Sequence, residues 1–397
     1  MSAPLPAPEL TMCVEAPIDP SVAVDVSVLP AKPGVFLFED ADGRTLALAS
    51  TSNLRRMITA KLAPPATDAG PTRRVNHRPL TRFIRAVRVD SAFEADWAYL
   101  QLARQRLAAT YRGLLDRWQA WFVQCNPDAP FPQWTKTVHP SLSGGMQPFG
   151  PMPDKHAAGR YIELLENAFD LCRYHHILVQ APNAAACAYK EMGRCPAPCD
   201  GSISMDDYRR RMQESVGFAD TPIDQWRSTI EHEMRLASGR LDFEAAARSQ
   251  QLLERTKLAA RAEFARVGSL RDFVFLSIMP GGGRTRARVF LIRGGWIQPI
   301  TTIALNITEE LIDGILRDSR ALAVPTPEDY SPAALENIGM VCWHLFRPKS
   351  AKPQGSFLRL DDGLDVHTVT KSLRMLQRDK TEPDSVITEQ DVENISP

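Results

Sequence analysis

The sequence predicts an α+β fold in several parts, because two kinds of hydrophobic periodicity occupy different regions of the chain. Apolar residues alternate with a period of two over 34–50 and again over 271–305, which is typical of β-hairpins and a β-meander. Between these regions, apolar side chains such as Leu164, Leu165 and Phe169 recur at helical spacing. A chain of 397 residues is long enough for two to three domains.

Composition limits the kinds of function that the chain can have. The 47 basic and 47 acidic side chains cancel, so any binding to nucleic acid must depend on local patches of charge. No run of eighteen apolar residues and no signal-peptide pattern occurs, so we expect a cytoplasmic protein and no membrane contact. The odd count of 7 cysteines then favours reduced thiols over disulfides.

Shifts in composition divide the chain into six predicted parts. They are a flexible leader rich in Pro and Ala (1–30), a small mixed domain (31–125), a linker with a cysteine module (126–203), a helical region (204–268), a β-meander with two helices (269–363) and a polar tail that we expect to be mobile (364–397).

The mixed domain begins with a β-hairpin followed by a helix. The runs GVFLFE and TLALAS flank the turn residues Asp40 to Gly43, and either Ser52 or Asn53 can cap the helix SNLRRMITAKL. Residues 95–124 then form a stretch rich in Ala, Leu, Arg and Gln that predicts a long helix, which the Pro-rich NPDAPFP ends.

Three cysteines share one short segment, CAYKEMGRCPAPCDG, and Cys172 lies upstream of it. Because Pro196 and Pro198 fix the backbone φ, residues 195–199 are expected to form a stiff loop that presents two thiols to one point. Four thiolates can hold zinc or an iron-sulfur cluster, and spacing alone does not separate the two. Ordinary buried thiols are the alternative, as we expect for the remaining Cys13, Cys125 and Cys342.

The longer segment CAYKEMGRCPAPCDGSISMDDYRRRM resembles the cysteine-rich segment of the UvrC family, the nuclease subunit of bacterial nucleotide excision repair. The resemblance implies a 4Fe-4S cluster on Cys187, Cys195 and Cys199, with Cys172 as the best fourth ligand and His175 or His176 as a fallback. Zinc is the alternative metal. QPFGPMPDKHAAGRYIELLENAFDLC also resembles the family segment that leads to these cysteines.

The hairpin and helix of the mixed domain resemble the GIY-YIG nuclease domain of UvrC proteins. The family pattern places its two catalytic tyrosines, its basic pair and its metal-binding glutamate at Phe36, Ala47, Ser50, Met57 and Gln101. None of these residues can replace the lost chemistry, so no catalytic residue is intact and a divalent metal is not expected. We therefore predict a pseudo-nuclease, although Arg56 lies next to the lost basic position and a one-residue slip would exchange Gln101 for Leu100.

Two alternatives concern charged residues of the same domain. One is a rebuilt metal site that uses Glu94, Asp96, Tyr99 or Tyr111. The other concerns the segment PTRRVNHRPLTRFIRAVRV, which is either a solvated strand and loop or a DNA-binding stripe that faces phosphates. The DNA-binding residues would be Arg73, Arg74, Arg78, Arg82, Arg85 and Arg88.

The helical region contains LDFEAAARSQQLLE, which resembles the UVR motif that UvrB and UvrC proteins share. The resemblance implies an antiparallel helical hairpin that docks onto a UvrB-type partner with Phe243 as its anchor. The partner-binding residues would be Leu241, Phe243, Glu244, Ala246 and Ala247. The alternative is a hairpin that packs on its own chain, and Gln250 and Gln251 stand where the family commonly has Arg-Asp.

The segment VFLIRGGWI resembles the first strands of the UvrC C-terminal half, and we expect too few residues after it for the family's RNase H-like nuclease. The leading hypothesis is therefore a non-cleaving UvrC-like protein of nucleotide excision repair that binds DNA or a UvrB-type partner. The alternatives are a metal-dependent GIY-YIG endonuclease with a rebuilt site and an iron-sulfur structural or sensing protein without a DNA role.

Overall fold

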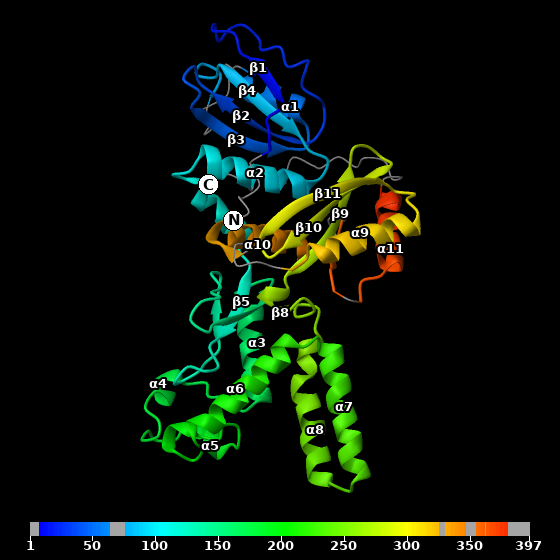
Figure 1. Ribbon diagram of the computed structural model, residues 1–397. Helices are drawn as coiled ribbons and strands as arrows, with labels where there is room; N and C mark the ends of the chain where they lie inside the picture. Colours follow the sequence, from blue (N-terminus) through cyan, green and yellow to red (C-terminus); the bar gives the residue numbers. More distant parts are fainter. Residues whose placement is uncertain (1–7, 64–75, 325–329, 347–354, 362, 380–397) are drawn as a thin grey trace.

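The computed structural model describes residues 8–63, 76–324, 330–346, 355–361 and 363–379. These residues form an α+β protein with three four-stranded sheets, each in its own part of the chain. Figure 1 shows the first sheet at one end, the C-terminal sheet and then the middle sheet further along, and a long helical hairpin at the other end. None of the described helices combines the length and the apolar composition needed to span a bilayer.

The first sheet has the strand order β1-β4-β2-β3, and all its pairings are antiparallel. Its strands are β1 (Met12–Glu15), β2 (Gly34–Glu39), β3 (Thr45–Thr51) and β4 (Phe83–Arg88). Helix α1 (Leu54–Leu62) packs on one face, and α2 (Ala92–Arg106) covers the other. The predicted hairpin is confirmed, and Asn53 caps α1 by accepting a hydrogen bond from the Arg56 amide.

The predicted flexible leader is wrong for residues 8–30. Strand β1 pairs with β4, and the side chain of Leu29 is fully buried. Two arginines fasten the rest of the segment, because Arg55 donates to the carbonyls of Ser27 and Leu29 and Arg78 donates to three others. The sequence did not reveal this because these partners are backbone groups far away in the chain.

The middle sheet has the order β6-β5-β7-β8 and packs against α3 (Lys155–Ala168) and α6 (Met205–Asp220). Its strands are β5 (Trp121–Cys125), β6 (Thr135–Thr137), β7 (Gln147–Met152) and β8 (Gly268–Ser269). Short helices lie between α3 and α6, namely α4 (His175–Leu178), α5 (Ala188–Glu191) and η2 (Pro198–Asp200).

The long helix expected over 95–124 is only partly present. Helix α2 ends at Arg106, a 3-10 helix η1 (Tyr111–Trp118) follows, and β5 already belongs to the middle sheet. Trp121, Phe122 and Val123 favour a strand once β6 and β7 are available as partners.

Two antiparallel helices form the predicted hairpin. Helix α7 (Ile223–Gly239) and helix α8 (Phe243–Thr256) lie side by side, and their turn is the end that lies farthest from the sheets (Figure 1). Leu241 makes this turn with a positive φ of 60°. The end of α8 packs into the middle core through Leu252 and Leu253, and η3 (Lys257–Ala260) and η4 (Leu270–Asp272) lead on to the next sheet.

The C-terminal sheet contains the predicted meander, in the order β11-β10-β9-β12. Its strands are β9 (Val274–Gly281), β10 (Arg286–Arg293), β11 (Trp296–Ala304) and β12 (Ser356–Arg359). Helices α9 (Glu309–Ala321) and α11 (Val366–Asp379) pack on one face, and α10 (Pro332–Leu345) packs with α2 on the other.

The predicted mobile tail is wrong for its first part. Val369, Leu373 and Leu376 of α11 are buried at helical spacing against β9 and α9. The polar composition of 364–397 hid this helix, whose apolar stripe has three main members. Residues 380–397 lie outside the described residues.

Candidate functional site

Three of the positions at which the sequence resemblance predicts GIY-YIG catalytic residues do come together. Phe36 of β2, Ala47 of β3 and Met57 of α1 belong to one hydrophobic cluster between the first sheet and α1. Phe36 is fully buried, and its ring centroid lies 5.2 Å from that of Phe38, which pairs with Ala47 across the strands. The place where a phenol and a cation were expected is therefore part of an apolar core.

The other two positions lie elsewhere. Ser50 stands opposite Val35 in the strand register, and Val35 belongs to the sheet face that α2 covers. Gln101 of α2 donates a hydrogen bond from Nε2 to Oδ1 of Asn337 on α10, 3.4 Å away. Leu100, its neighbour, is fully buried in the core that α2 shares with the C-terminal sheet.

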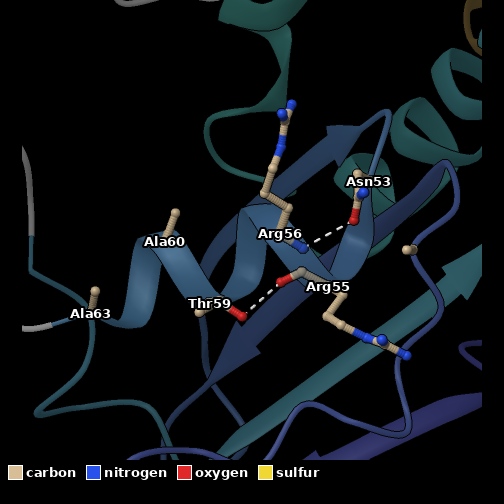
Figure 2. A pocket seen from close by; sticks show the side chains of 7 residues that line it. Asn53, Arg55, Arg56, Thr59, Ala60 and Ala63 are labelled. Atoms are coloured by element: carbon tan, nitrogen blue, oxygen red, sulfur yellow. Dashed lines mark hydrogen bonds between the residues drawn. The ribbon is translucent and has the colours of Figure 1, made fainter. Parts of the chain in front are cut away.

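A shallow hollow of about 450 Å³ lies along α1 and contains the one nearby cation considered as a substitute, Arg56 (Figure 2). Its lining residues are Ala31, Asn53, Arg55, Arg56, Thr59, Ala60 and Ala63. Figure 2 shows the side chains of Arg55 and Arg56 leaving α1 in opposite directions. Met57, not Arg56, points into the cluster around Phe36, so the hollow and that cluster are separate.

The acidic residues considered for a rebuilt site fasten α2 to the C-terminal half. Glu94 is buried and accepts a hydrogen bond from Nη1 of Arg288 at 2.6 Å. Asp96 lies 2.9 Å from Nε2 of His344 and 3.2 Å from Nη2 of Arg117. Burial raises the pKa of Glu94, and Arg288 opposes this shift.

The two tyrosines of that alternative also contribute to the contact of α2 with α10 and η1. The hydroxyl of Tyr111 donates to Oε1 of Glu336 at 3.2 Å, and Tyr99 packs edge-on against Trp118. The four residues therefore face partners on β10, α10 and η1 and do not converge on a common metal position.

The arginine stripe is largely satisfied within the chain. Arg73 and Arg74 lie outside the described residues. Arg78 is buried and donates to the carbonyls of Pro17, Asp19 and Val22, so its guanidinium is occupied within the chain. Its role is to hold the N-terminal segment.

The remaining arginines of the stripe are closer to solvent. Arg82 donates to the carbonyls of Pro79 and Thr81. Arg85 and Arg88 are paired with Glu39 and Asp90 at 2.7 Å, but each guanidinium side chain stays partly exposed. They can still contact phosphate, although with less free charge than the sequence suggested.

The cysteines gather at the far end of the middle unit. Cys172 follows α3, and its amide donates to the hydroxyl of Tyr208, while Cys195 and Cys199 are buried in the loop before α6. The backbone turns with a positive φ at Ala197 (55°) and Gly201 (79°), on either side of Cys199. Cys187 precedes α5 and is half-buried.

The thiols are close enough to influence one another. A hydrogen bond between Cys172 and Cys195 raises the pKa of Cys172 and lowers that of Cys195. Burial raises the pKa of Cys199, and the charges of Cys195 and Cys187 add to this shift. Cys125 and Cys342, both in hydrophobic cores, lie apart from this group as expected.

The sulfur donors suit a soft metal or an iron-sulfur cluster chemically. In the part of the chain that the structure describes, no group of three or more His, Cys, Asp or Glu side chains has an arrangement that could hold a metal ion. The fallback ligand His175 lies 3.1 Å from the carbonyl oxygen of Phe131 through Nε2, and His176 packs beside Tyr174.

The tip of the helical hairpin is open to solvent. Leu241 is 72% exposed and Phe243 is 67% exposed. Glu244 and Ala247 are also exposed, and Ala246 is half-buried. The start of α7 and the end of α8 pack on the chain's own core, so the alternative of an entirely self-packed hairpin does not describe its tip.

One group of side chains was not anticipated from the sequence. Tyr174 and Tyr189, each two positions after a cysteine, meet on the surface of the cysteine module together with Arg173 and His176. The available signal was the repeated spacing of Cys and Tyr in CRY and CAY. It could not indicate that the two tyrosines would touch.

Comparison with known proteins places the middle unit in a family. The family model of the UvrC/Cho excinuclease middle domain matches residues 120–218. Proteins named UvrABC system protein C are similar over longer stretches: that of Gemmatimonas aurantiaca is 28% identical over 58% of this chain and 37% of its own length, and that of Carboxydothermus hydrogenoformans is 26% identical over 79% and 51%. No solved structure matches.

The chain thus contains a region, residues 120–218, that matches the UvrC/Cho excinuclease middle domain. The chain is homologous to part of the UvrC-family proteins, which confirms the family resemblance of its sequence. It spans about half or less of the length of these relatives. The GIY-YIG-like, iron-sulfur and UVR-like assignments stay predictions.

Proposed function

We propose that this chain is a non-cleaving, UvrC-like protein of nucleotide excision repair that binds DNA and a UvrB-type partner. The observation that carries the proposal is the apolar cluster of Phe36, Ala47 and Met57 in a homologue of part of UvrC. Hydrolysis of a phosphodiester needs an activated water and compensation for charge on the phosphate. A hydrocarbon core supplies neither.

An incision assay tests this proposal. We expect no strand cleavage of lesion-bearing or nicked duplex with Mg²⁺ or Mn²⁺, alone or with repair partners, while a cleavage-competent UvrC protein cuts the same substrate. The same protein should bind the duplex with an affinity that falls as salt rises, because bound arginines release counterions.

Cleavage by the wild-type chain that disappears in Arg56→Ala would overturn the proposal and restore the endonuclease alternative. Arg56 is the suitable probe because its exposed side chain contributes neither to a hydrophobic core nor to the contact between α2 and the C-terminal half. Glu94→Gln is less clean, since Glu94 also anchors Arg288. Absence of both cleavage and DNA binding would favour the structural or sensing alternative.

The four cysteines support a second part of the proposal, a 4Fe-4S cluster that fastens the middle unit. Cys172, Cys187, Cys195 and Cys199 lie on three segments of the chain, and their thiols influence one another. A cluster there would cross-link these segments. Zinc is the alternative occupant.

The exposed hairpin tip supports the third part, docking onto a matching UvrB-type hairpin. Phe243 offers the partner an open aromatic side chain, flanked by Leu241. Phe243→Glu should abolish binding in a pull-down or titration with a UvrB-type hairpin. The thermal melt should stay nearly unchanged, because surface substitutions usually alter the free energy of unfolding by less than about 0.5 kcal/mol.

Leu311→Glu is the matched control, since Leu311 is a similarly exposed apolar side chain on α9, far from the hairpin in sequence. It should bind the partner normally. A Phe243→Glu protein that still binds, or one that loses much of its stability, would show that Phe243 is not a docking residue.

A further inference from the structure

A compact patch of aromatic and cationic side chains lies beside the cysteines. Two segments form it, residues 173–176 and helix α5. The ring centroid of Tyr174 lies 5.8 Å from that of Tyr189 and 5.7 Å from that of His176. The guanidinium carbon of Arg173 lies 4.2 Å from the Tyr189 centroid, over the ring. We call these four residues the tyrosine patch.

The tyrosine patch is held in place but remains open. Arg173 donates from Nη1 to the carbonyl of Arg194 at 3.3 Å and from Nη2 to Oδ1 of Asn167, which fixes its guanidinium over Tyr189. Tyr174 is nevertheless 41% exposed. An aromatic ring that is fixed by neighbours and still reaches solvent can accept a flat ligand without losing much conformational freedom.

Two cationic side chains lie beside the patch. Arg194 is exposed next to it, and Lys190 of α5 is held by Asp200 and Ser202. Glu191 is the exposed acidic residue of the same helix. The hairpin tip is different, since its exposed apolar residues include Leu236, Leu241 and Phe243. Aromatic rings with nearby cations suit a nucleic acid, which has planar bases and an anionic backbone, better than an apolar protein surface.

We propose that the tyrosine patch stacks unpaired nucleobases of single-stranded or locally opened DNA, with Tyr174 as the stacking ring and Arg194 beside the phosphate backbone. This inference rests on the proposed DNA binding and adds to it the form of DNA and the residues. Every base has a π-face, so such a site selects exposed bases without selecting sequence. Locally opened DNA offers such bases, whereas intact duplex does not.

The test compares binding of the full chain to two fluorescent strands of equal length by anisotropy. One is an oligothymidylate, and the other has abasic sites at its central positions. Both carry the same phosphates, so their difference reports base contacts alone. The wild-type protein should bind the base-bearing strand roughly tenfold more tightly, as expected for one or two stacked bases.

Three variants separate stacking from other effects. Tyr174→Ala should bind both strands equally, with the weaker affinity. Tyr174→Phe keeps the ring and should keep the tenfold preference. Trp343→Ala removes an exposed aromatic side chain of α10 and should also keep it. Unchanged thermal melts of the variants would show that the preference reports binding and not folding.

Each contrary result has its own meaning. If the wild-type protein binds both strands equally, or if Tyr174→Ala retains the preference, base stacking by the tyrosine patch is refuted. The proposed DNA binding is then unaffected. A wild-type protein that binds neither strand nor duplex overturns both the patch and the proposed DNA binding. If Tyr174→Ala loses only a UvrB-type protein partner, the patch is a protein interface and the inference is wrong.

Discussion

The first sheet and the middle unit differ in where they place residues that could carry chemistry. In the first sheet, the predicted hairpin and helix form, and Phe36, Ala47 and Met57 fill the positions of the predicted nuclease site with apolar side chains. In the middle unit, thiols and two tyrosines gather in the short helices and loops between α3 and α6, and this is the region that the family model matches. The first sheet thus has an apolar core at the predicted catalytic positions, whereas the middle unit gathers potential ligands in segments with little regular secondary structure.

The difference has a physical basis. A catalytic pocket leaves polar groups incompletely paired, and apolar side chains that replace them enlarge the core. Residues such as Cys195 and Tyr174 carry little of the hydrophobic core's packing, so their side chains are available for binding. The charged side chains of α2 have a structural role, because Glu94, Asp96 and Arg104 pair with the C-terminal half.

The largest expected effect lies in the middle unit. Anaerobically purified wild-type protein should be brown, with about four irons per chain. Cys195→Ala should lose colour, iron and soluble yield together, because the loop around Cys195 would lose the cross-link that holds it. Iron analysis and visible absorbance measure this result.

Cys13→Ala is the control, since Cys13 lies on strand β1, far from the other thiols in sequence. It should keep iron and solubility. Stoichiometric zinc without iron would defeat the cluster but leave the ligands in place. Wild-type protein with neither iron nor zinc would show that the cysteines of the middle unit do not form a metal site. The middle unit would then differ less from the first sheet.

The next prediction compares the effect of one hydroxyl group on stability in the two units: it is added in Phe36→Tyr and removed in Tyr174→Phe. Phe36→Tyr returns the hydroxyl of the nuclease pattern to a fully buried apolar site. An unpaired buried hydroxyl should lower the free energy of unfolding by about 1–3 kcal/mol in urea titrations. Tyr174→Phe, which removes a hydroxyl from an exposed ring, should change it by less than about 0.5 kcal/mol.

A Phe36→Tyr protein with wild-type stability would show that the hydroxyl reaches water or a polar partner. The cluster around Phe36 would then open to solvent, and the first sheet would retain more of a pocket than its packing indicates. Cleavage activity gained by this variant would point in the same direction.

Local signals predicted much of the fold. The hairpin over 34–51, the Asn53 cap, the paired helices α7 and α8 and the three-stranded meander follow from turn residues and periodicity within short windows. The structure differs where a partner far away in the chain decides. Strand β1 needs β4, and α11 needs the face of β9.

The candidate sites divide in the same way. The cysteine segment and the exposed Phe243 could be identified from motifs because their residues lie close together in sequence. The burial of Arg78 could not, since its partners at Pro17 and Val22 are carbonyl groups that any sequence provides. The tyrosine patch needs two segments of the chain to meet, residues 173–176 and helix α5, which a charge or hydropathy pattern does not encode.

The smallest expected effect tests the core beneath the cysteine module. Burial raises the pKa of Glu166 on α3 to about 7, against an ordinary value of 4.5. Because the folded state favours the protonated form, its contribution to stability is complete below about pH 4.5 and is lost as pH rises through 7. Glu166→Gln should therefore flatten this dependence.

Thermal melts at pH 5 and pH 8 measure the change. A shift of one pKa unit corresponds to about 1.4 kcal/mol, and partial exposure of Glu166 reduces the gain of Glu166→Gln at pH 8 to the order of 1 kcal/mol. At pH 5 the two proteins should melt nearly alike. Glu214→Gln, on the exposed side of α6, should match the wild type at both values. A Glu166→Gln protein that is less stable at pH 8 would show that the ionised carboxylate has a stabilising partner, with Arg173 of the tyrosine patch as the nearest favourable charge.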